Sequence, residues 1–334
     1  MKREKKILYS DTKLNREVPS NYLPADRHLF EIGFSYTMPA AYYYELNDIV
    51  ISDYFIFSKK GLVLRETFSN YKRKVGFIKL VAKNLAYLIS GKTGSKNGKH
   101  FWAIDEWSLN YFHWFTEVLP KYYYLKSKEE TISLLLPDSY RNHSFITVSL
   151  SMLDISHDWL SRKSTKIKFL YFPEISAVSG NNLPGVLKKI GNGIVKGCNA
   201  GNVSNQRIYI SRKFARFRRV INEDELLPIL EKFGFQVCYF ESMNFQEQVK
   251  LVNGAEIILG MHGAGMMNMI FMPENRKVVE FIIGGKGHNN CYYSMANSMG
   301  HKYYYLVTSS ENPDHPDTNV KVDPIQLKDL LEKL

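Results

Sequence analysis

The chain has few cysteines and no long apolar run, and these absences exclude several classes of protein. Its 334 residues include only three cysteines, Cys198, Cys238 and Cys291, which stand far apart. Such isolated cysteines form neither a disulfide framework nor the paired spacing of a zinc site. No stretch of about 18 apolar residues occurs, so the sequence predicts no membrane-spanning helix. The charged N-terminus carries no apolar signal segment, and we expect a cytoplasmic protein.

Motifs of several enzyme classes are missing as well. The nine histidines show neither H-x-x-x-H nor H-E-x-x-H, and no Asp-x-Asp follows an expected strand, so the sequence predicts no metal site. GKTGS at 91–95 resembles the end of a Walker A loop, but that motif requires glycine where Ala86 stands. Without G-x-S-x-G, a serine esterase would lack its nucleophile.

The residues that are present describe a globular protein with excess positive charge. Hydrophobic residues make up 45% and charged residues 23%, which are values of folded proteins. The length favours two domains. Lys and Arg number 44 against 33 Asp and Glu, a formal net charge of +11, so an anionic partner is expected.

Nine of these basic residues lie between 188 and 219, a range without any acidic residue. Such a run is typical of a nucleic-acid surface, of a solvated linker, or of a phosphate clamp built from the forked donors of arginine. The clamp would draw on Arg212, Arg216, Arg218 and Arg219. Acidic residues at 223–225 follow directly, so we predict no nucleic-acid partner.

The second half of the chain alternates between strand and helix patterns. Strands are expected at 206–211, 235–240, 256–261, 277–282 and 301–307, and helices at 222–234, 244–254, 289–299 and from Asp323. Asn222 with Glu225 and Asn244 with Glu247 have the spacing of capping boxes. This alternation predicts βαβ units and a parallel, doubly wound sheet.

The first half predicts a second α/β layer with a β-rich N-terminal part. A hairpin is expected across 49–58 and 61–66, and a helix at 76–89. Further strands are expected at 100–104, 132–136 and 167–172, with helices at 110–126 and 140–153. The Gly-, Asn- and Ser-rich range 176–205 is the expected linker, so the predicted domains are 1–175 and 206–334.

Polar residues follow the strands of the second half where those strands end. Ligands of parallel sheets bind beyond the carboxyl ends of the strands, where we expect Arg212, Glu241, His262 and Glu280 to share one rim. The HGAG turn at 262–265 stands between a strand and a helix start, a place that favours an anion such as a diphosphate. A tight turn that needs glycine only for packing is the other interpretation.

A second constellation stands on the expected helix at 110–126. His113 and Glu117 are four residues apart and therefore share a helix face. Histidine with a carboxylate partner is a plausible general base for a hydroxyl group. A core histidine satisfied by Glu117 is the alternative.

Three strings then carry a resemblance: NYFHWFTEVLPKYYYL, YISRKFARFRRVINEDELL and LGMHGAGMMNMIFMPENRKVVEF. Together with CYYSMANSMGHKYYYL and the C-terminus, they make the range 100–334 similar to the glycosyltransferase 61 family. The resemblance implies a GT-B fold, in which two Rossmann-like domains face a cleft. It also implies inverting transfer of a sugar from a nucleotide-diphosphate donor, commonly UDP-linked, without an essential metal or other cofactor. Bacterial members are often described as capsular polysaccharide biosynthesis proteins.

Carried onto this chain, the resemblance assigns the donor to the C-terminal domain and the acceptor to the N-terminal one. His113 would be the base, oriented by Glu117. The donor diphosphate would be bound by Arg212, by one of Arg218 and Arg219, and by His262, Gly263, Ala264, Gly265 and Asn268. The ribose or base would be bound by Glu241, Glu280 and Gln248. The expected partners are a nucleotide sugar and a glycan or lipid-linked glycan. The sequence also allows peripheral contact with the inner membrane and does not determine the oligomeric state. A non-catalytic module that binds a nucleotide or glycan is the alternative function.

Overall fold

The computed structural model describes residues 5–52, 55–58, 86, 93–175, 177–201, 205–286 and 288–334. The chain forms two compact units, one of residues 1–12 and 39–177, the other of residues 13–38 and 178–334. The expected hairpin partner at 61–66 and nearly all of the expected helix at 76–89 lie outside the described residues. Both units combine a sheet with helices, so the predicted α/β class is confirmed.

The first unit contains a mixed sheet in the order β1-β4-β9-β6-β7-β8, with β5 also paired to β4. Its strands are β1 (Lys5–Tyr9), β4 (Ala41–Ser52), β5 (Phe55–Ser58), β6 (Gly94–Phe101), β7 (Ser133–Pro137), β8 (His157–Leu160) and β9 (Ser164–Glu174). The strands β8, β7, β6 and β9 are parallel, while β1, β4 and β5 are antiparallel. Across the parallel part the chain order reverses between β6 and β9, the place where Rossmann-like sheets bind ligands.

The helix after β6 follows the prediction and adds a widened turn. It consists of α3 (Tyr111–His113), the π-helical turn η3 (Trp114–Val118) and α4 (Leu119–Lys126). The side chain of Asn110 accepts a 2.9 Å hydrogen bond from the backbone N–H of Phe112 and begins the helix. Pro120 has no N–H to donate to the preceding turn, which agrees with the wider winding there. The other expected helix is η4 (Asp138–Asn142) with α5 (Ser144–Met152).

The second unit contains a fully parallel sheet in the order β11-β10-β12-β13-β14. The strands are β10 (Gln206–Ile210), β11 (Phe235–Cys238), β12 (Ala255–Met261), β13 (Lys277–Ile283) and β14 (Lys302–Thr308). All five agree with the predicted ranges to within about two residues, the usual uncertainty of element ends. The order is that of flavodoxin-like sheets, whose ligand crevice lies between the first and third strands, here β10 and β12.

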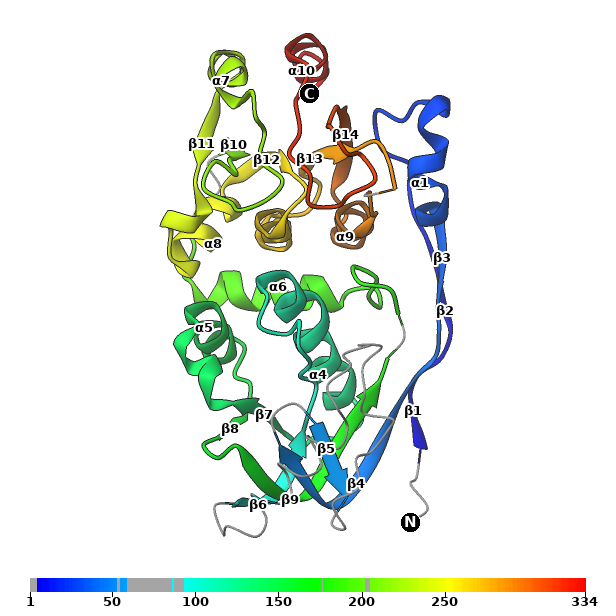
Figure 1. The fold of residues 1–334 in the computed structure, drawn as a ribbon, viewed down its shortest axis with the longest axis vertical. Coiled ribbons are helices and arrows are strands. Elements are labelled where there is room, and N and C mark those ends of the chain that lie inside the picture. Colours follow the sequence, from blue (N-terminus) through cyan, green and yellow to red (C-terminus); the bar gives the residue numbers. More distant parts are fainter. Residues whose placement is uncertain are drawn as a thin grey trace. The chain divides into compact units, whose positions relative to one another are not determined.

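Helices cover both faces of this sheet, with α7 and α10 on one side and α8 and α9 on the other (Figure 1). The helices are α6 (Val186–Gly197), α7 (Glu223–Lys232), η5 (Phe240–Ser242), α8 (Phe245–Asn253), the 3-10 helix η6 (Ala264–Phe271), α9 (Cys291–Met299) and α10 (Pro324–Leu331). Leu226 and Leu230 of α7 and Leu327 of α10 are fully or nearly fully buried against Leu259 and Phe281 of the sheet. Burial of each such side chain stabilises the fold by about 1.5–3 kcal/mol.

The unit boundaries differ from the predicted domains in two places. Residues 13–38 belong to the second unit, where Phe30 of α1 (Arg27–Phe34) packs among Tyr293, Tyr303 and Tyr305. In the same unit β2 (Thr12–Asn15) pairs with β3 (Ser35–Met38), and η1 (Pro24–Asp26) precedes α1. The expected linker contains α6, which packs on η6. A Cβ on Gly191 of α6 would lie 1.9 Å from the Ile270 carbonyl oxygen, so only glycine permits this approach.

The predicted caps had mixed outcomes. Asn244 and Glu247 form the capping box that their spacing predicted, and Asp323 caps α10. The Asn222 capping box is wrong, because the Asn222 side chain makes no cap bond to α7. Instead it donates to the Val322 carbonyl at 2.8 Å and accepts from the Val322 N–H at 3.0 Å. It therefore ties the start of α7 to the segment before α10.

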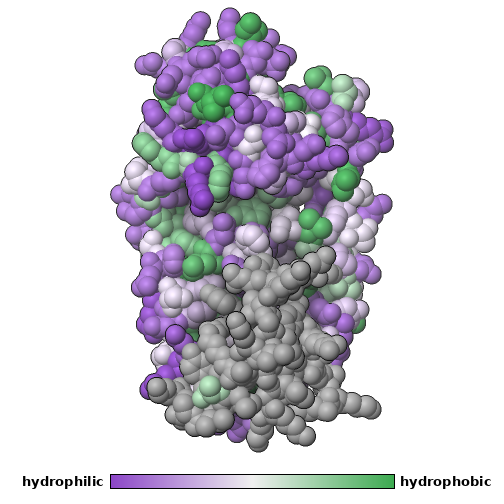
Figure 2. Space-filling view, in the orientation of Figure 1, coloured by the Kyte–Doolittle hydropathy of each residue, from purple (hydrophilic) through white to green (hydrophobic). Residues whose placement is uncertain are grey.

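Where Figure 2 colours the surface by hydropathy, hydrophilic residues predominate and hydrophobic residues form separate patches. Large hydrophobic side chains that are exposed in the second unit include Phe214, Ile221 and Ile325. Within the part of the chain that the structure describes, no helix is long and apolar enough to cross a bilayer.

His301 is a buried histidine that joins the start of β14 to η6. Its Nε2 donates a 3.0 Å hydrogen bond to the Met269 carbonyl, and burial lowers its pKa to about 4. An unfolded histidine has a pKa of about 6.5. Between these values only the unfolded chain binds the proton, so stability falls as the pH falls through this window.

We predict that His301→Gln removes this acid sensitivity, because the amide of Gln can donate to the same carbonyl without titrating. Relative to the variant, the wild type should lose about 3 kcal/mol of unfolding free energy between pH 7.5 and pH 4. Urea unfolding of both proteins across this range measures the difference, in which the titrations common to both proteins cancel. Parallel stability curves would contradict the prediction.

Candidate functional site

The carboxyl ends of β10 and β12 meet at the reversal point of the second sheet. Arg212 follows β10 and the HGAG turn follows β12. A Cβ on Gly263 would lie 2.1 Å from Nη1 of Arg212, so the guanidinium lies directly on the glycine backbone. The structure thus brings together the two motifs that the sequence analysis placed on one rim.

Arg212 carries a half-buried charge that is held by backbone carbonyl groups. Its Nε donates to the Arg218 carbonyl at 3.0 Å and its Nη2 to the Phe217 carbonyl at 2.9 Å. Among the described residues no carboxylate lies within ion-pair distance of it. Burial, and then the nearby charge of Arg218, lower the Arg212 pKa, but an arginine remains charged at neutral pH. A charge held in this way favours an anionic ligand.

The other basic residues after β10 differ in exposure: Arg218 is partly buried, whereas Lys213, Arg216 and Arg219 face solvent. Arg218 adopts a left-handed backbone conformation with φ +58°, and its Nε lies 3.5 Å from Oδ1 of Asp317. Of the predicted clamp, Arg212 and Arg218 are therefore turned toward the protein, whereas Arg219 contributes a backbone N–H bonded to the Asn319 side chain.

The HGAG turn leads into the 3-10 helix η6, so it stands between a strand and a helix start, as expected. A Cβ on Gly265 would lie 3.0 Å from Cγ2 of Ile210, so small residues let this turn approach β10 closely. The first turn of a helix presents backbone N–H groups without intrahelical partners. Ala264 and Gly265 directly follow Gly263, against which the Arg212 guanidinium lies, so their N–H groups are candidate donors for the same anion.

Glu280 is not at the rim, where we expected it to contact ribose. Its side chain is 1% exposed and its Oε1 lies 2.5 Å from Nδ1 of His262. Its Oε2 accepts a 2.6 Å hydrogen bond from the Tyr303 hydroxyl, whose pKa is raised well above its ordinary value, first by burial and then by the Glu280 charge. Both carboxylate oxygens are thus occupied by protein groups, which argues against the ribose contact. Glu241, in η5 after β11, is the exposed acid of the predicted rim.

Gln248 and Asn268 connect the segments around the site. Gln248 Nε2 donates to the carbonyls of Phe240 and Met243 at 3.0 and 3.1 Å, and its Oε1 lies 3.4 Å from Asn268 Nδ2. Asn268 Nδ2 also lies 2.9 Å from the Gly265 carbonyl. These contacts join η5 and α8 to η6, which fits a supporting role.

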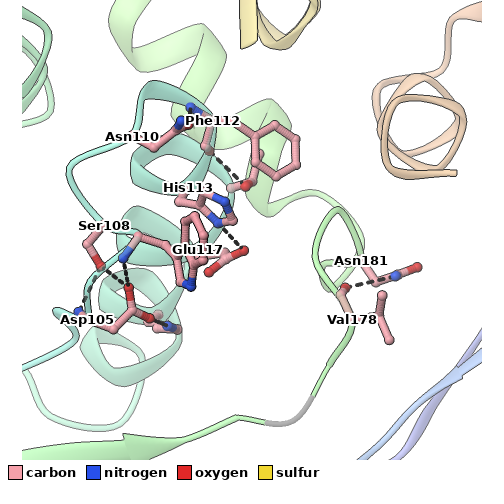
Figure 3. Close-up of polar contacts among 11 residues, drawn as sticks. Asp105, Ser108, Asn110, Phe112, His113, Glu117, Val178 and Asn181 are labelled. Carbon is pink, nitrogen blue, oxygen red and sulfur yellow. Dashed lines mark hydrogen bonds and ion pairs between the residues drawn. The ribbon is translucent and has the colours of Figure 1, made fainter. Parts of the chain in front are cut away.

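In the first unit, His113 and Glu117 form the pair that their spacing predicted. Nδ1 of His113 lies 2.7 Å from Oε1 of Glu117 (Figure 3). Their side chains are 22% and 21% exposed, so His113 is not a fully buried core residue. With Nδ1 occupied, Nε2 is the nitrogen that a ligand can reach. Trp114 and Phe115, by contrast, are fully buried core residues.

The loop after β6 adds residues that the sequence analysis did not single out. Oδ1 of Asp105 accepts from the Trp107 N–H at 3.0 Å and from the Ser108 hydroxyl at 2.8 Å (Figure 3). The Trp107 ring is 56% exposed and its centroid lies 5.9 Å from that of His113. An Asp at the end of an expected strand, followed by Ser, is a turn signal that could have marked this loop.

Across the described residues, no group of three or more His, Cys, Asp or Glu side chains is placed to hold a metal ion. The predicted independence from metal is not tested by this observation and stays a prediction.

The fold and site define an α/β protein with a half-buried arginine at the reversal point of a parallel sheet. The model of the family described as Glycosyltransferase 61 matches residues 111–279, half of the chain, including His113, Arg212 and the HGAG turn. The chain therefore belongs to the glycosyltransferase 61 family.

Named relatives match over shorter ranges. The EGF domain-specific O-linked N-acetylglucosamine transferase of Drosophila melanogaster is 32% identical over 117 residues, 33% of this chain and 22% of that protein. The protein of the same name from Bos taurus is 28% identical over 115 residues, 33% of this chain and 21% of the relative. The rice alpha-1,3-arabinosyltransferase XAT3 is 32% identical over 73 residues, 21% of this chain and 13% of that protein. The matches thus span about a fifth or less of the length of these relatives.

We predict that Gly263→Ala weakens anion binding, because the new Cβ would displace the Arg212 guanidinium. Loss of a charge-assisted contact of this kind should weaken binding of inorganic diphosphate by about 10- to 100-fold. Isothermal titration calorimetry measures it, with Gly201→Ala as the control, since a Cβ at Gly201 meets open space. Equal diphosphate affinity in Gly263→Ala and wild type would contradict the prediction.

Proposed function

We propose that this protein is an inverting glycosyltransferase of the GT-B type that moves a sugar from a UDP-linked donor to a hydroxyl group of a glycan. The observation that carries the proposal is Arg212, a half-buried cation that pairs with no carboxylate among the described residues and lies against Gly263 at the reversal point of the second sheet. A nucleoside diphosphate supplies the missing negative charge. Family membership supports the transfer of a sugar.

The donor half stabilises the leaving group. In glycosyl transfer the bond between the anomeric carbon and the leaving oxygen breaks through an oxocarbenium-like transition state. Negative charge then grows on the diphosphate. Arg212, Arg218 and the N–H groups at the start of η6 are preorganised to bind that charge, which is commonly the largest electrostatic contribution to such a reaction.

The acceptor half supplies the base. Nε2 of His113 removes the proton of the acceptor hydroxyl while the acceptor oxygen bonds to the anomeric carbon and the diphosphate departs. Glu117, at Nδ1, orients the ring and stabilises the imidazolium that forms. A single displacement of this kind inverts the anomeric centre. The proposed chemistry uses arginines and amides for charge neutralisation and is metal-independent.

The acceptor and the sugar are proposed on narrower grounds. A role in capsular or surface polysaccharide synthesis is proposed because bacterial members of the family are often described as capsular polysaccharide biosynthesis proteins. The relatives' names indicate N-acetylglucosamine and arabinose as transferred sugars, so membership of the family leaves the sugar undetermined. The alternative is a non-catalytic module that binds a nucleotide or glycan, and transfer of labelled sugar to an acceptor panel separates the two.

We predict that UDP stabilises the wild type and that Arg212→Ala abolishes the effect. UDP at 100-fold its dissociation constant should add about 2.7 kcal/mol, which raises Tm by roughly 5–11 °C for domains of this size. The rise should persist in EDTA. Arg216→Ala is the control, because Arg216 is exposed and its guanidinium lies over the Phe217 ring. If UDP raises the Tm of Arg212→Ala as much as that of the wild type, Arg212 does not bind the diphosphate.

We predict that His113→Ala lowers kcat by about 10²–10⁴-fold, the usual contribution of a general base, while UDP binding is retained. Steady-state transfer of labelled sugar and the UDP thermal shift measure the two properties on the same protein. His157→Ala, an exposed histidine of the same unit, serves as the control. Full activity of His113→Ala would return His113 to a structural role.

A further inference from the structure

His262 is bonded through Nδ1 to a buried acid. Glu280 on β13 approaches Nδ1 of His262 at 2.5 Å, and Tyr303 on β14 donates its hydroxyl proton to the other carboxylate oxygen at 2.6 Å. The carboxylate is 1% exposed, whereas the His262 side chain is 13% exposed. The histidine therefore connects the interior of the sheet to the rim where Gly263 and Arg212 meet.

The groups near the other ring nitrogen are hydrogen-bond donors. Nδ2 of Asn289 lies 3.2 Å from Nε2 of His262. The orientation of this amide is fixed, because its Oδ1 accepts a 3.1 Å hydrogen bond from the Cys291 N–H, which can only donate. The Cys291 sulfur lies 4.0 Å from Nε2. Burial raises the Cys291 pKa well above its ordinary value, so the thiol keeps its proton.

The neutral ring with its proton on Nδ1 is the state in which these neighbours satisfy both ring nitrogens of His262. A proton on Nε2, in the imidazolium or in the other neutral tautomer, would face the N–H group of Asn289 and leave two donors opposed. A neutral ring with its proton on Nδ1 donates to Glu280 and accepts at Nε2. The glutamate thus sets the tautomer, as acidic partners of functional histidines do.

We propose that Glu280, whose other oxygen is anchored by Tyr303, is a positioning residue that holds His262 as the neutral Nδ1–H tautomer, so that its Nε2 accepts a hydrogen bond from a hydroxyl group of the nucleotide-sugar donor. This inference rests on the proposed function. It changes the role that we expected for His262, because a nitrogen that only accepts cannot bind a phosphate oxygen, which also only accepts. Diphosphate binding then belongs to Arg212, Arg218 and the amides.

The present partner of Nε2 shows where the ligand hydroxyl would lie. Asn289 is exposed and precedes α9, and its amide is a neutral donor that a hydroxyl group can replace. The Tyr292 ring packs edge-on against His262, with centroids 4.8 Å apart, and limits the rotation of the imidazole. The hydroxyl could belong to the ribose or to the transferred sugar, and both have the chemistry that Nε2 requires.

The tautomer is tested by 15N NMR of the imidazole, which distinguishes a protonated from an unprotonated ring nitrogen without any need for activity. The wild type should show Nδ1 protonated and Nε2 unprotonated. Glu280→Gln should reverse this, because Tyr303 would hold the amide oxygen and the amide N–H would face Nδ1. Tyr303→Phe keeps the carboxylate and should keep the wild-type tautomer. An imidazolium at neutral pH in the wild type, or no reversal in Glu280→Gln, would overturn the proposal.

The ligand is tested by the affinities of wild type and His262→Ala for inorganic diphosphate, UDP and UDP-N-acetylglucosamine. Diphosphate should bind both proteins equally. Loss of one neutral hydrogen bond should weaken binding to His262→Ala by about threefold to tenfold. If this loss first appears with UDP, the hydroxyl belongs to the ribose. If it appears only with UDP-N-acetylglucosamine, the hydroxyl belongs to the sugar. A loss already present with diphosphate, or equal affinities for all three ligands, overturns the proposal. If the wild type binds none of the three ligands, the proposed function is wrong, whereas the tautomer measured by NMR is unaffected.

Discussion

The contact between Arg212 and Gly263 is the constraint on which the proposed donor site depends. It joins the carboxyl ends of β10 and β12, the strands on either side of the reversal point, and it requires a residue without a side chain at 263. The guanidinium is fixed by the carbonyls of Phe217 and Arg218 rather than by an acid. A cation bound only by carbonyl groups is oriented but not neutralised, so it remains available to an anionic ligand.

Two histidines, one in each unit, are held by glutamates through the same ring nitrogen. His113 with Glu117 stands on one helix, and His262 with Glu280 spans β12 and β13. The first pair is about one-fifth exposed, which suits proton exchange with a substrate hydroxyl. In the second pair the glutamate is almost completely buried, which suits a fixed tautomer. Burial of the carboxylate, rather than the residue types, distinguishes the two proposed roles.

Membership of the glycosyltransferase 61 family rests on a match that covers half of the chain, while the named relatives match over about a third of it or less. The matched range includes the two segments with the clearest geometry, the helix of His113 and the loops of Arg212 and HGAG. Glu280 stands directly after that range, and Tyr303 and Asn289 lie further along. The residues proposed to control His262 therefore come from structure rather than from the family match.

Local rules of the sequence determined the alternation of strands and helices, the capping box of Asn244 with Glu247, and the pairing of His113 with Glu117, because each depends on residues at most a few positions apart. The convergence of Arg212 with HGAG also followed, since parallel strands end on one edge. Tertiary structure alone decided that Asn222 bonds to Val322 and that residues 13–38 pack with the second unit. It also decided that Glu280 is enclosed between His262 and Tyr303. These contacts join residues that are distant in the chain, and no local pattern records which face of a strand will be buried against which neighbour.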